Sequence, residues 1–520
     1  MADILTTIVE KRKADIERLG LAFGFEIPEK RGRPVHPFLA EKGVILEVKR
    51  ASPSKGDIAP NLDAAETARS YAAAGARAIS CLTEGNYFKG TLEDLMNVCS
   101  AVDEYAAGAA GSSKSESLCV MPAVLRKDFL LSADEVDISY RAGADAILLI
   151  ARILEEAVIV EMAKAAAGYG MTCLVEVRSE EDLEKLAAVA AAVDSKYIVC
   201  GVNSRDLATF RIDLLKPCAL LGKIRGVLGD DARVVFESGI RTPQAARFAG
   251  SLGFTGMLLG EAAAKAPELG EELVKAFVNS VSNKNAEFWT EYSSNTEQCC
   301  HAELVSASPV NEIPKQVRDD VIRPLIKICG LTRAEDVLYA DSLGADFVGF
   351  IFAAGFGRNV CGERFEAIKP VLKNVLTKKV AVITDINSPE AEAAASYVEQ
   401  GILDCIQLHG IEYSEVPERF LSLPHYFAIT EKNGSLEQAA EKLFLMGEPR
   451  FLQDSKSQSY DTNHKLWLAG GVTPENALEL VEHFQPELID VSSGVEDDVV
   501  GIKNHEKIKK IMEIKNDTIR

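Results

Sequence analysis

The stretch VILEVKRASPSK, residues 44–55, reads as a buried strand that runs directly into reactive side chains. Its first residues, 44–46, are apolar and favour a strand. Glu47 and Lys49 then share one face, because strand side chains alternate with a period of two. A solvated ion pair at a strand end is the simplest interpretation. The alternative is a site at the carboxyl end of a buried strand, where an acid and a base face a ligand.

Seven further apolar runs follow this stretch and alternate with segments rich in Ala, Glu and Leu. The eight runs begin at residues 44, 77, 119, 145, 172, 197, 233 and 255. Such alternation predicts parallel strands joined by right-handed helical crossovers. Eight strand–helix units over about 240 residues match the size of a closed (β/α)8 TIM barrel. A doubly wound open sheet is the second candidate, although no G-x-G-x-x-G turn follows the first strand.

The pattern breaks between residues 278 and 323 and then resumes. The intervening segment is polar, has no sustained period and contains two prolines, so we expect a linker with at most one short helix. Runs beginning at residues 325, 346, 379, 404, 426, 450, 466 and 487 then predict a second, smaller barrel. The expected α/β organisation is two TIM barrels in tandem: residues 1–277 with an N-terminal helical extension, a polar linker over 278–323, and residues 324–520.

Charge and composition exclude several classes of partner. The net charge of −21, with no basic block, argues against nucleic acid or an anionic membrane. No apolar run is long enough to span a membrane, and the N-terminal helix carries charges throughout, unlike a signal peptide. The 11 scattered cysteines indicate free thiols in the cytoplasm. Only His36 of the 7 histidines precedes residue 300, which disfavours a His-based metal site in the first half.

Glycines follow the last two strands of each predicted barrel. In such barrels these loops often hold a phosphate with backbone amides, and glycine lets the backbone approach the anion closely. A glycine at a strand end is commonly only a turn. Four loops at matching positions nevertheless predict that both barrels bind phosphorylated small molecules. The loop residues are Glu237, Ser238, Gly239 and Gly260 in the first barrel, and Gly470, Gly471, Ser493 and Gly494 in the second.

Charged and polar residues also gather at the expected strand ends of the first barrel. If the barrel closes, these side chains converge on one mouth, where opposed charges tune a lysine as an acid and a carboxylate as a base. A set of solvated end charges is the alternative interpretation. The residues are Glu47, Lys49, Lys127, Glu176, Asn203, Arg205 and Glu237.

The motifs ILEVKRASPSKG, LRKDF, VEVRSEEDL, GVNSRDL and FESGI resemble indole-3-glycerol phosphate synthase, in order, across residues 1–277. The resemblance implies closure of a pyrrole ring in 1-(2-carboxyphenylamino)-1-deoxyribulose 5-phosphate, with loss of CO2 and water. It makes Lys127 the general acid at the substrate carbonyl and Glu176 the acid/base of the dehydration, assisted by Glu47. It places Lys49 near the substrate carboxylate. The other substrate contacts that we expect are Ser52, Asn203, Arg205, Glu237, Ser238, Gly239 and Gly260.

The motifs IKICGLTRAEDV, FVGFIF, CIQLHG, LAGGVTPENA and DVSSGVE resemble phosphoribosylanthranilate isomerase, from residue 324 to about 515. Read alone, Cys329 is a buried core cysteine more often than a base. The resemblance makes it the general base that removes the C2′ proton in an Amadori rearrangement, and makes Asp454 the general acid at the furanose ring oxygen. It implies substrate contacts at Arg358, Gln407 and His409, to which the expected phosphate loops add Gly470, Gly471, Ser493 and Gly494. The two activities are consecutive steps of tryptophan synthesis.

The second barrel departs from its family pattern in two places. The segment after Asp454, SKSQSYDTNHKLW, has no glycine where the family usually carries a Gly-Gly-Thr-Gly loop, and AAGFGRN replaces a Pro-Lys-Ser-Pro-Arg-like stretch. We expect a monomeric bifunctional enzyme without metal or organic cofactor. The alternatives are an active synthase with a weakened or non-catalytic second barrel, two enzymes of another sugar-phosphate pathway, and a scaffold that binds phosphate without turnover.

Overall fold

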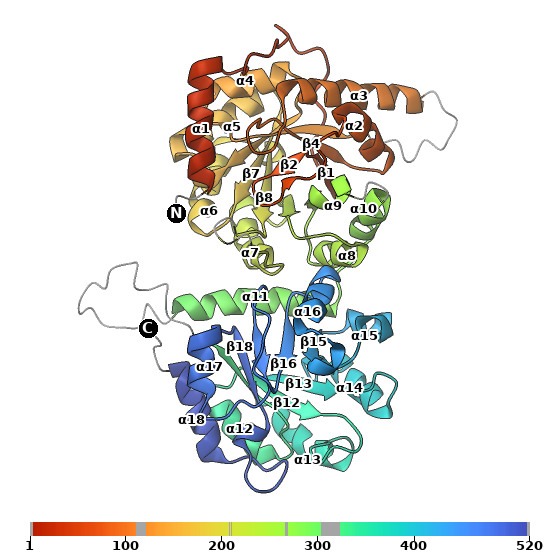
Figure 1. Cartoon of the computed structure of the whole chain (residues 1–520), viewed down its shortest axis with the longest axis vertical. Helices are drawn as coiled ribbons and strands as arrows, with labels where there is room; N and C mark the ends of the chain where they lie inside the picture. Colours follow the sequence, from red (N-terminus) through yellow and green to blue (C-terminus); the bar gives the residue numbers. More distant parts are fainter. Residues whose placement is uncertain are drawn as a thin grey trace, which may run out of the picture. The chain divides into compact units, whose positions relative to one another are not determined.

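The computed structural model describes residues 4–110, 121–206, 209, 211–265, 269–302 and 323–516. The chain divides into two compact units, and each contains one closed barrel of eight parallel strands with helices outside it (Figure 1). The predicted tandem of TIM barrels is therefore confirmed, and the open doubly wound sheet is wrong. No described helix is both long enough and apolar enough to cross a bilayer.

The first barrel closes because β1 pairs in parallel with both β4 and β10. A short antiparallel hairpin, β2 (Ala51–Ser52) and β3 (Gly56–Asp57), follows β1. The barrel strands are β1 (Gly43–Val48), β4 (Ala78–Leu82), β5 (Ala123–Lys127), β6 (Ala146–Ile150), β7 (Thr172–Val177), β8 (Ile198–Asn203), β9 (Val234–Glu237) and β10 (Gly256–Leu259). The helices are α1 (Ile4–Leu19), α2 (Ala64–Ala73), α3 (Leu92–Ala110), α4 (Asp134–Arg141), α5 (Glu156–Gly168), α6 (Glu181–Ala192), α7 (Lys216–Leu228), α8 (Pro243–Ser251), α9 (Glu261–Lys265) and α10 (Gly270–Val278).

One strand start differs from the sequence expectation. The apolar run at residue 119 predicts a strand over CVMPAV, whereas β5 begins at Ala123, after Pro122. Proline has no amide hydrogen to contribute to a sheet, so a strand is favoured only beyond it. Residues 119 and 120 lie outside the described residues.

The second barrel closes because β11 pairs with both β12 and β18. Its strands are β11 (Leu325–Ile328), β12 (Phe347–Ile351), β13 (Lys378–Ile383), β14 (Cys405–His409), β15 (His425–Thr430), β16 (Phe451–Asp454), β17 (Trp467–Ala469) and β18 (Leu488–Val491). Its helices are α12 (Ala334–Ser342), α13 (Glu363–Leu372), α14 (Pro389–Glu399), α15 (Glu418–Ser422), α16 (Leu436–Leu445), α17 (Ala477–Phe484) and α18 (His505–Asn516).

The segment expected to be a linker contains more structure than the sequence indicates. Helix α11 (Lys284–Ala302) has 19 residues, and its first turns pack on the second barrel. The fully buried Trp289 lies 6.0 Å, centroid to centroid, from Trp467, the first residue of β17. The Asn285 side chain accepts a hydrogen bond from the amide of His425, the first residue of β15. Residues 303–322 of the expected linker lie outside the described residues.

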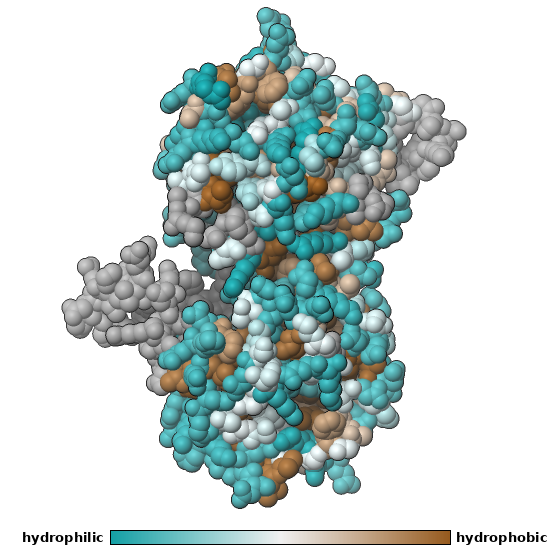
Figure 2. All heavy atoms as spheres, in the orientation of Figure 1, coloured by the Kyte–Doolittle hydropathy of each residue, from teal (hydrophilic) through white to brown (hydrophobic). Residues whose placement is uncertain are grey.

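The core of the first barrel lies inside the ring of strands. It includes Ile45, Leu125, Leu174, Val199, Val235 and Leu258, each from a different strand. On the face shown in Figure 2, hydrophilic side chains cover most of both units, and hydrophobic ones form small separate groups. Because apolar side chains fill the interior of the first barrel, its polar side chains can gather only at the ends of the strands.

Candidate functional site

The strand period places the candidate residues of the first barrel in one layer. Each of four interior apolar residues is followed two positions later by a charged one, namely Glu47 after Ile45, Lys127 after Leu125, Glu176 after Leu174 and Glu237 after Val235. Residues two apart on a strand face the same side. The four charged side chains therefore lie directly above the apolar core, at the carboxyl ends of β1, β5, β7 and β9.

Lys127 is the centre of this layer. Its Nζ lies 3.0 Å from Oε2 of Glu47 and 3.7 Å from Oε2 of Glu237. Lys49, the first residue after β1, forms an ion pair with the other oxygen of Glu47. The carboxyl groups of Glu47 and Glu237 are almost completely buried, whereas Lys49 and Lys127 each keep 16% of their side-chain surface. The lysines are thus the members of this cluster that remain open to a ligand.

The cluster separates the proton affinities of its carboxyl groups. Burial favours the neutral form of Glu47, but Lys127 and Lys49 outweigh it and lower the pKa of Glu47 to about 2. Burial, followed by the negative charge of Glu176, raises the pKa of Glu237 to about 8. Burial also opposes the charge of Lys127, yet the surrounding carboxylates raise its pKa above the ordinary value. At neutral pH the layer therefore holds a charged lysine, an ionised Glu47 and a protonated Glu237.

Two glycines in the same layer provide the room that the carboxylates occupy. Gly201 follows Val199 by two residues on β8, and a Cβ added there would overlap Oε1 of Glu237. Gly260 follows Leu258 by two residues, and its Cβ would overlap Oε1 of Glu47. Gly260 is among the residues predicted from the sequence, whereas Gly201 is not. Gly201 begins the sequence GVN at the carboxyl end of β8, and this position at a strand end is the signal that could have identified it.

Glu176 has its own cation. Its Oε1 accepts hydrogen bonds from Nε and Nη2 of Arg178, at 2.8 and 2.6 Å. Burial opposes the charge of Glu176, but Arg178 and then Lys127 lower its pKa, with a further hydrogen bond from the Asn203 side chain. Arg178 is absent from the sequence-based prediction, although it follows Glu176 at the same period of two. Glu176 is therefore ionised and oriented before any ligand arrives.

The remaining first-barrel candidates lie on loops around this layer. Ser52 belongs to the β2–β3 hairpin, and its Oγ lies 3.5 Å from Oγ of Ser54. The backbone amide of Arg205 donates to Oδ1 of Asn203. Ser238 has a φ of 72° and its carbonyl accepts from Ser204, and Gly239 follows with a φ of 87°. Within the described part of the chain, Ser52, Ser238 and Gly239 form no hydrogen bond with the four charged side chains, so they lie beside the charged layer.

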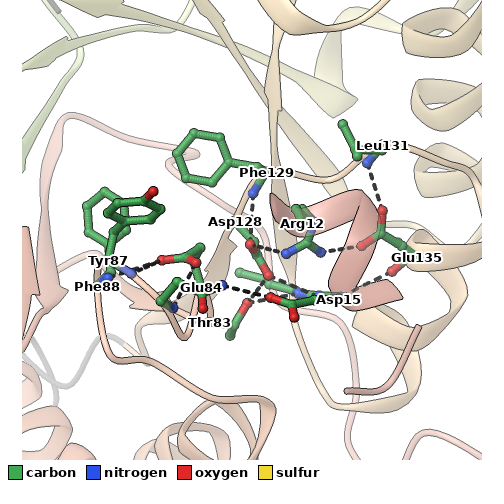
Figure 3. Close-up of polar contacts among 12 residues, drawn as sticks. Arg12, Asp15, Thr83, Glu84, Tyr87, Phe88, Asp128, Phe129, Leu131 and Glu135 are labelled. Atoms are coloured by element: carbon green, nitrogen blue, oxygen red, sulfur yellow. Dashed lines mark hydrogen bonds and ion pairs between the residues drawn. The ribbon is translucent and has the colours of Figure 1, made fainter. Parts of the chain in front are cut away.

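A second polar network holds the strand end that carries Lys127 (Figure 3). Arg12 on α1 is buried and donates to Oδ1 of Asp128 at 2.6 Å, while its other terminal nitrogen pairs with Glu135. Thr83, directly after β4, donates to Oδ2 of Asp128 at 2.5 Å. The sequence prediction omits Arg12, because a cation within an amphipathic helix is usually exposed. Its burial joins the N-terminal helix to the residue next to Lys127.

The second barrel gathers a different set of groups. Cys329 follows β11, and its Sγ lies 3.4 Å from Nζ of Lys327, two residues earlier on the strand. Lys327 also donates to Oε1 of Gln407 at 2.7 Å and to Oδ2 of Asp490 at 2.6 Å. Burial, and then Asp490, raise the pKa of the Cys329 thiol, against the opposing effect of Lys327 and Lys503. Lys327 and Asp490 are interior charges that the sequence prediction misses.

His409 and Asp454, on β14 and β16, face each other at the mouth. His409 Nε2 lies 3.8 Å from Oδ2 of Asp454, and its Nδ1 lies 3.1 Å from Nε2 of Gln407. Burial lowers the pKa of His409, although Asp454 acts in the opposite direction. The hydroxyl of Tyr426 completes the contacts of Gln407 at 3.0 Å. Gln407, His409 and Asp454 therefore form a chain of polar groups that leads from Lys327 to the mouth.

Arg358 is held by a carboxylate on the loop after β18. Its Nε and Nη2 donate to the two oxygens of Glu496 at 2.7 and 2.6 Å. Lys503 also approaches Glu496, at 3.3 Å, and donates to the carbonyl of Ser492 at 2.9 Å. Glu496 and Lys503 are further residues that the sequence prediction does not include. The bidentate contact fixes the plane of the Arg358 guanidinium.

The expected phosphate loops of the second barrel pack on one another. Gly470 and Gly471 follow β17 with φ angles of 98° and 67°. Ser493 and Gly494 form a short 3-10 turn after β18, and a Cβ on Gly494 would overlap the carbonyl of Val472. These four residues therefore lie where the sequence places them, at the carboxyl ends of β17 and β18.

The loop after Asp454 is held by side chains instead of glycines. Ser457 donates to Glu431 at 2.6 Å, Ser455 donates to the same oxygen at 3.0 Å, and Tyr460 donates to the carbonyl of Ala469 at 2.9 Å. Gln458 takes the left-handed conformation, with a φ of 55°. A polar cavity of about 520 Å³ lies beside this loop and is lined by Glu431, Ser457 and Tyr460, among others. In the described part of the chain, no group of three or more His, Cys, Asp or Glu gathers as metal ligands.

Comparison with known proteins gives a family for each barrel. The family model described as indole-3-glycerol phosphate synthase matches residues 35–276, and the model described as N-(5'-phosphoribosyl)anthranilate isomerase matches residues 326–514. A multifunctional tryptophan biosynthesis protein of Phycomyces blakesleeanus is 29% identical over 90% of this chain and 62% of its own length. The chain therefore spans less than two thirds of that relative.

Two single-domain relatives match one barrel each. An indole-3-glycerol phosphate synthase of Syntrophobacter fumaroxidans is 34% identical over 52% of this chain and 95% of its own length. A solved phosphoribosylanthranilate isomerase of Thermus thermophilus is 32% identical over 36% of this chain and 96% of its own, with a TM-score of 0.30. The chain thus belongs to the indole-3-glycerol phosphate synthase family through its first barrel and to the phosphoribosylanthranilate isomerase family through its second.

Proposed function

We propose that the protein is a bifunctional enzyme of tryptophan biosynthesis. The second barrel isomerises N-(5-phosphoribosyl)anthranilate to 1-(2-carboxyphenylamino)-1-deoxyribulose 5-phosphate. The first barrel converts that product to indole-3-glycerol phosphate, with loss of CO2 and water. The observation that carries the proposal is the position of Lys127 between Glu47 and Glu237 in a barrel of the synthase family.

In the synthase barrel, Lys127 acts as the general acid on the substrate carbonyl. Its charge, stabilised by the surrounding carboxylates, lies where negative charge develops on the oxygen. Glu176, ionised and oriented by Arg178, accepts and returns the proton of the dehydration, and Glu47 assists it. Lys49 holds the carboxylate that leaves as CO2. Asn203, Arg205, Glu237 and Ser238 line the pocket, with Ser52 at its edge.

The sugar phosphate of the synthase substrate binds on the loops that follow β9 and β10. Gly239 and Gly260 let backbone amides approach the phosphate oxygens closely. Phosphate sites on the loops after the last two strands are common in barrels of this kind. Binding there leaves the ring and carbonyl over Lys127.

In the isomerase barrel, Cys329 and Asp454 act from different strands. The Cys329 thiolate removes the C2′ proton, and Asp454 protonates the furanose ring oxygen, which opens the ring. The contact between Asp454 and His409 places the acid beside a group that also reaches Gln407. Arg358, Gln407 and His409 contact the substrate. Gly470, Gly471, Ser493 and Gly494 hold the phosphate through backbone amides.

An alternative keeps the synthase and makes the second barrel a phosphate-binding module. The missing glycine-rich loop motivates it, but the isomerase family model matches residues 326–514, a range that includes this loop. The side-chain contacts of Ser457 and Tyr460 also give the loop a fixed path of its own. The comparisons therefore favour two activities.

A crossed experiment on the full chain tests the proposal. Lys127→Ala should abolish conversion of the deoxyribulose phosphate to indole-3-glycerol phosphate and leave the isomerase rate unchanged. Cys329→Ala should abolish the isomerase and leave the synthase unchanged. Each variant serves as the control for the fold of the other barrel. Wild-type protein that turns over neither substrate, or a Lys127→Ala variant with full synthase activity, refutes the proposal.

A further inference from the structure

A buried ion pair lies inside the second barrel, below the residues assigned to the isomerase reaction. Lys327 is 1% exposed and Asp490 is 7% exposed, and the two residues are direct partners across β11 and β18. Oδ1 of Asp490 is buried and has no hydrogen-bond partner among the described residues. Replacing such a pair by apolar side chains often stabilises a protein, so a role in the fold alone explains it poorly.

The contacts of Lys327 suggest what the pair is for. Its ammonium group lies 3.4 Å from Sγ of Cys329, the residue that directly follows β11. It is fixed there by Asp490 and by Gln407, whose other contacts are Tyr426 and His409. A lysine held from two sides cannot turn away from the thiol. A cation at this distance favours the negative form of the sulfur.

We propose that Lys327 is a positioning residue that allows Cys329 to exist as the thiolate. The inference deepens the proposed isomerase function and rests on it. The thiol loses its proton to water at the open mouth, and the resulting negative charge pairs with the Lys327 ammonium, which keeps all its protons. During isomerisation the thiolate accepts the C2′ proton and becomes a thiol, and that proton must leave before the next turnover.

Other charged groups around Cys329 also influence how readily its thiol ionises. Arg358 and Lys503 add positive charge, and both are partly neutralised by their contacts with Glu496. Asp490 opposes ionisation, because it is already the anionic partner of Lys327. Lys327 is the only one of these cations with a direct contact to the sulfur among the described residues.

This competition predicts effects of opposite sign for two substitutions. Lys327→Met removes the cation with little change of volume, so the thiolate becomes rarer. Asp490→Asn removes the competing anion, so the thiolate becomes the remaining partner of Lys327 and more abundant. A purely structural ion pair predicts the same direction for both, because either change leaves one buried charge without its partner.

Alkylation by iodoacetamide measures the thiolate directly and needs no turnover. Peptide mass spectrometry on the full chain assigns the rate at each cysteine. Cys361, a half-buried thiol on the loop after β12, is the internal reference in every sample. At pH 7.5 we expect Cys329 in Lys327→Met to react at least about tenfold more slowly than in wild type, and in Asp490→Asn several-fold faster. The reference rate at Cys361 should stay constant.

Three outcomes overturn the inference: an unchanged Cys329 rate in Lys327→Met, a slower or unchanged rate in Asp490→Asn, or equal shifts of both cysteines. If Lys327→Met does not fold by circular dichroism, Asp490→Asn decides alone. The pH dependence of isomerase kcat in Lys327→Met should also move to higher pH, with KM nearly constant. Absence of isomerase activity in wild type would refute the proposed function, whereas the alkylation rates would still test Lys327.

Discussion

Each barrel has a lysine among its polar groups, but the two lysines lie at different depths below the mouth of the barrel. The depth determines whether the lysine can reach a substrate or only a neighbouring side chain. In the first, Lys127 lies at the strand end, 3.0 Å from Glu47 and open to the mouth. In the second, Lys327 lies one alternation deeper, buried below Cys329. A lysine at the rim can donate a proton to a substrate, whereas a buried one can only act on a neighbouring side chain. The same fold therefore supports either role, according to the strand position that carries the charge.

The helices added to each barrel differ in the same way. In the first, α1 inserts Arg12 beside Asp128, at the carboxyl end of β5. In the second, α11 places Trp289 against Trp467, at the amino end of β17. The carboxyl ends hold the chemistry in barrels of this kind, and the amino ends hold the fold together. We therefore expect α1 to support activity and α11 to support stability.

The largest expected effect tests the rule that strand ends carry the chemistry. Asp454→Asn, at the carboxyl end of β16, should lower isomerase kcat by about 10²–10⁴-fold, the usual contribution of a general acid. Asp404→Asn is the matched control, because Asp404 lies just before the amino end of β14, where it accepts from Lys379. Steady-state kinetics of both variants decide. A larger loss in Asp404→Asn would reverse the rule.

Loss of Trp289 should mainly weaken the second barrel. Trp289→Ala removes a fully buried indole and should cost about 3–5 kcal/mol. The chain has 2 tryptophans, and both lie in the second unit, so fluorescence of the remaining Trp467 reports its unfolding in urea. Leu376→Ala, at a side chain that is 94% exposed, should leave the midpoint unchanged. Equal midpoints for Trp289→Ala and wild type would remove α11 from the stability of this barrel.

Glu237 should make the stability of the first barrel depend on pH. Its pKa is about 8 in the folded protein and lies near 4.5 when unfolded, so it is protonated when folded and ionised when unfolded between these values. Raising the pH through this window favours unfolding. Glu237→Gln should therefore lose less stability from pH 6 to pH 9 than wild type, by up to about 3 kcal/mol. Calorimetry at both pH values measures this, and parallel losses would contradict the assignment.

The smallest expected effect concerns the glycines of the charged layer. Gly201→Ala should destabilise the first barrel by about 1–3 kcal/mol and lower synthase activity, because the new methyl group displaces Glu237. Gly222→Ala is the control, since nothing lies within 4 Å of its Cβ on the exposed side of α7, and it should stabilise by up to about 1 kcal/mol. Thermal unfolding of both variants measures the difference. Equal changes in the unfolding temperature of the two variants would mean that the charged layer can accommodate a methyl group at Gly201.

Local pattern alone predicts the strand ends that converge. Glu47, Lys127 and Glu176 are each recognisable because a polar residue follows a buried run at a period of two, and barrel closure makes those ends meet. Asp454 and His409 were predicted only through the resemblance to phosphoribosylanthranilate isomerase, because a single acid or histidine at a strand end is not distinctive by itself. Arg12 and Lys327 were not predicted, because a lysine or arginine in the interior of an element looks the same in sequence whether it is solvated or buried. Arg178 was also missed, although it directly follows β7.

The sequence by itself determined two barrels, their order, and the strand ends at which polar groups face a common mouth, because alternation and period are local properties of the chain. Only the tertiary structure decided the pairing: that Lys127 lies between Glu47 and Glu237, that burial and Glu176 raise the pKa of Glu237, and that the ammonium of Lys327 lies 3.4 Å from the sulfur of Cys329. These depend on distances of a few ångströms between residues far apart in the chain. Burial and Coulomb energies change steeply over such distances, and no local pattern encodes them.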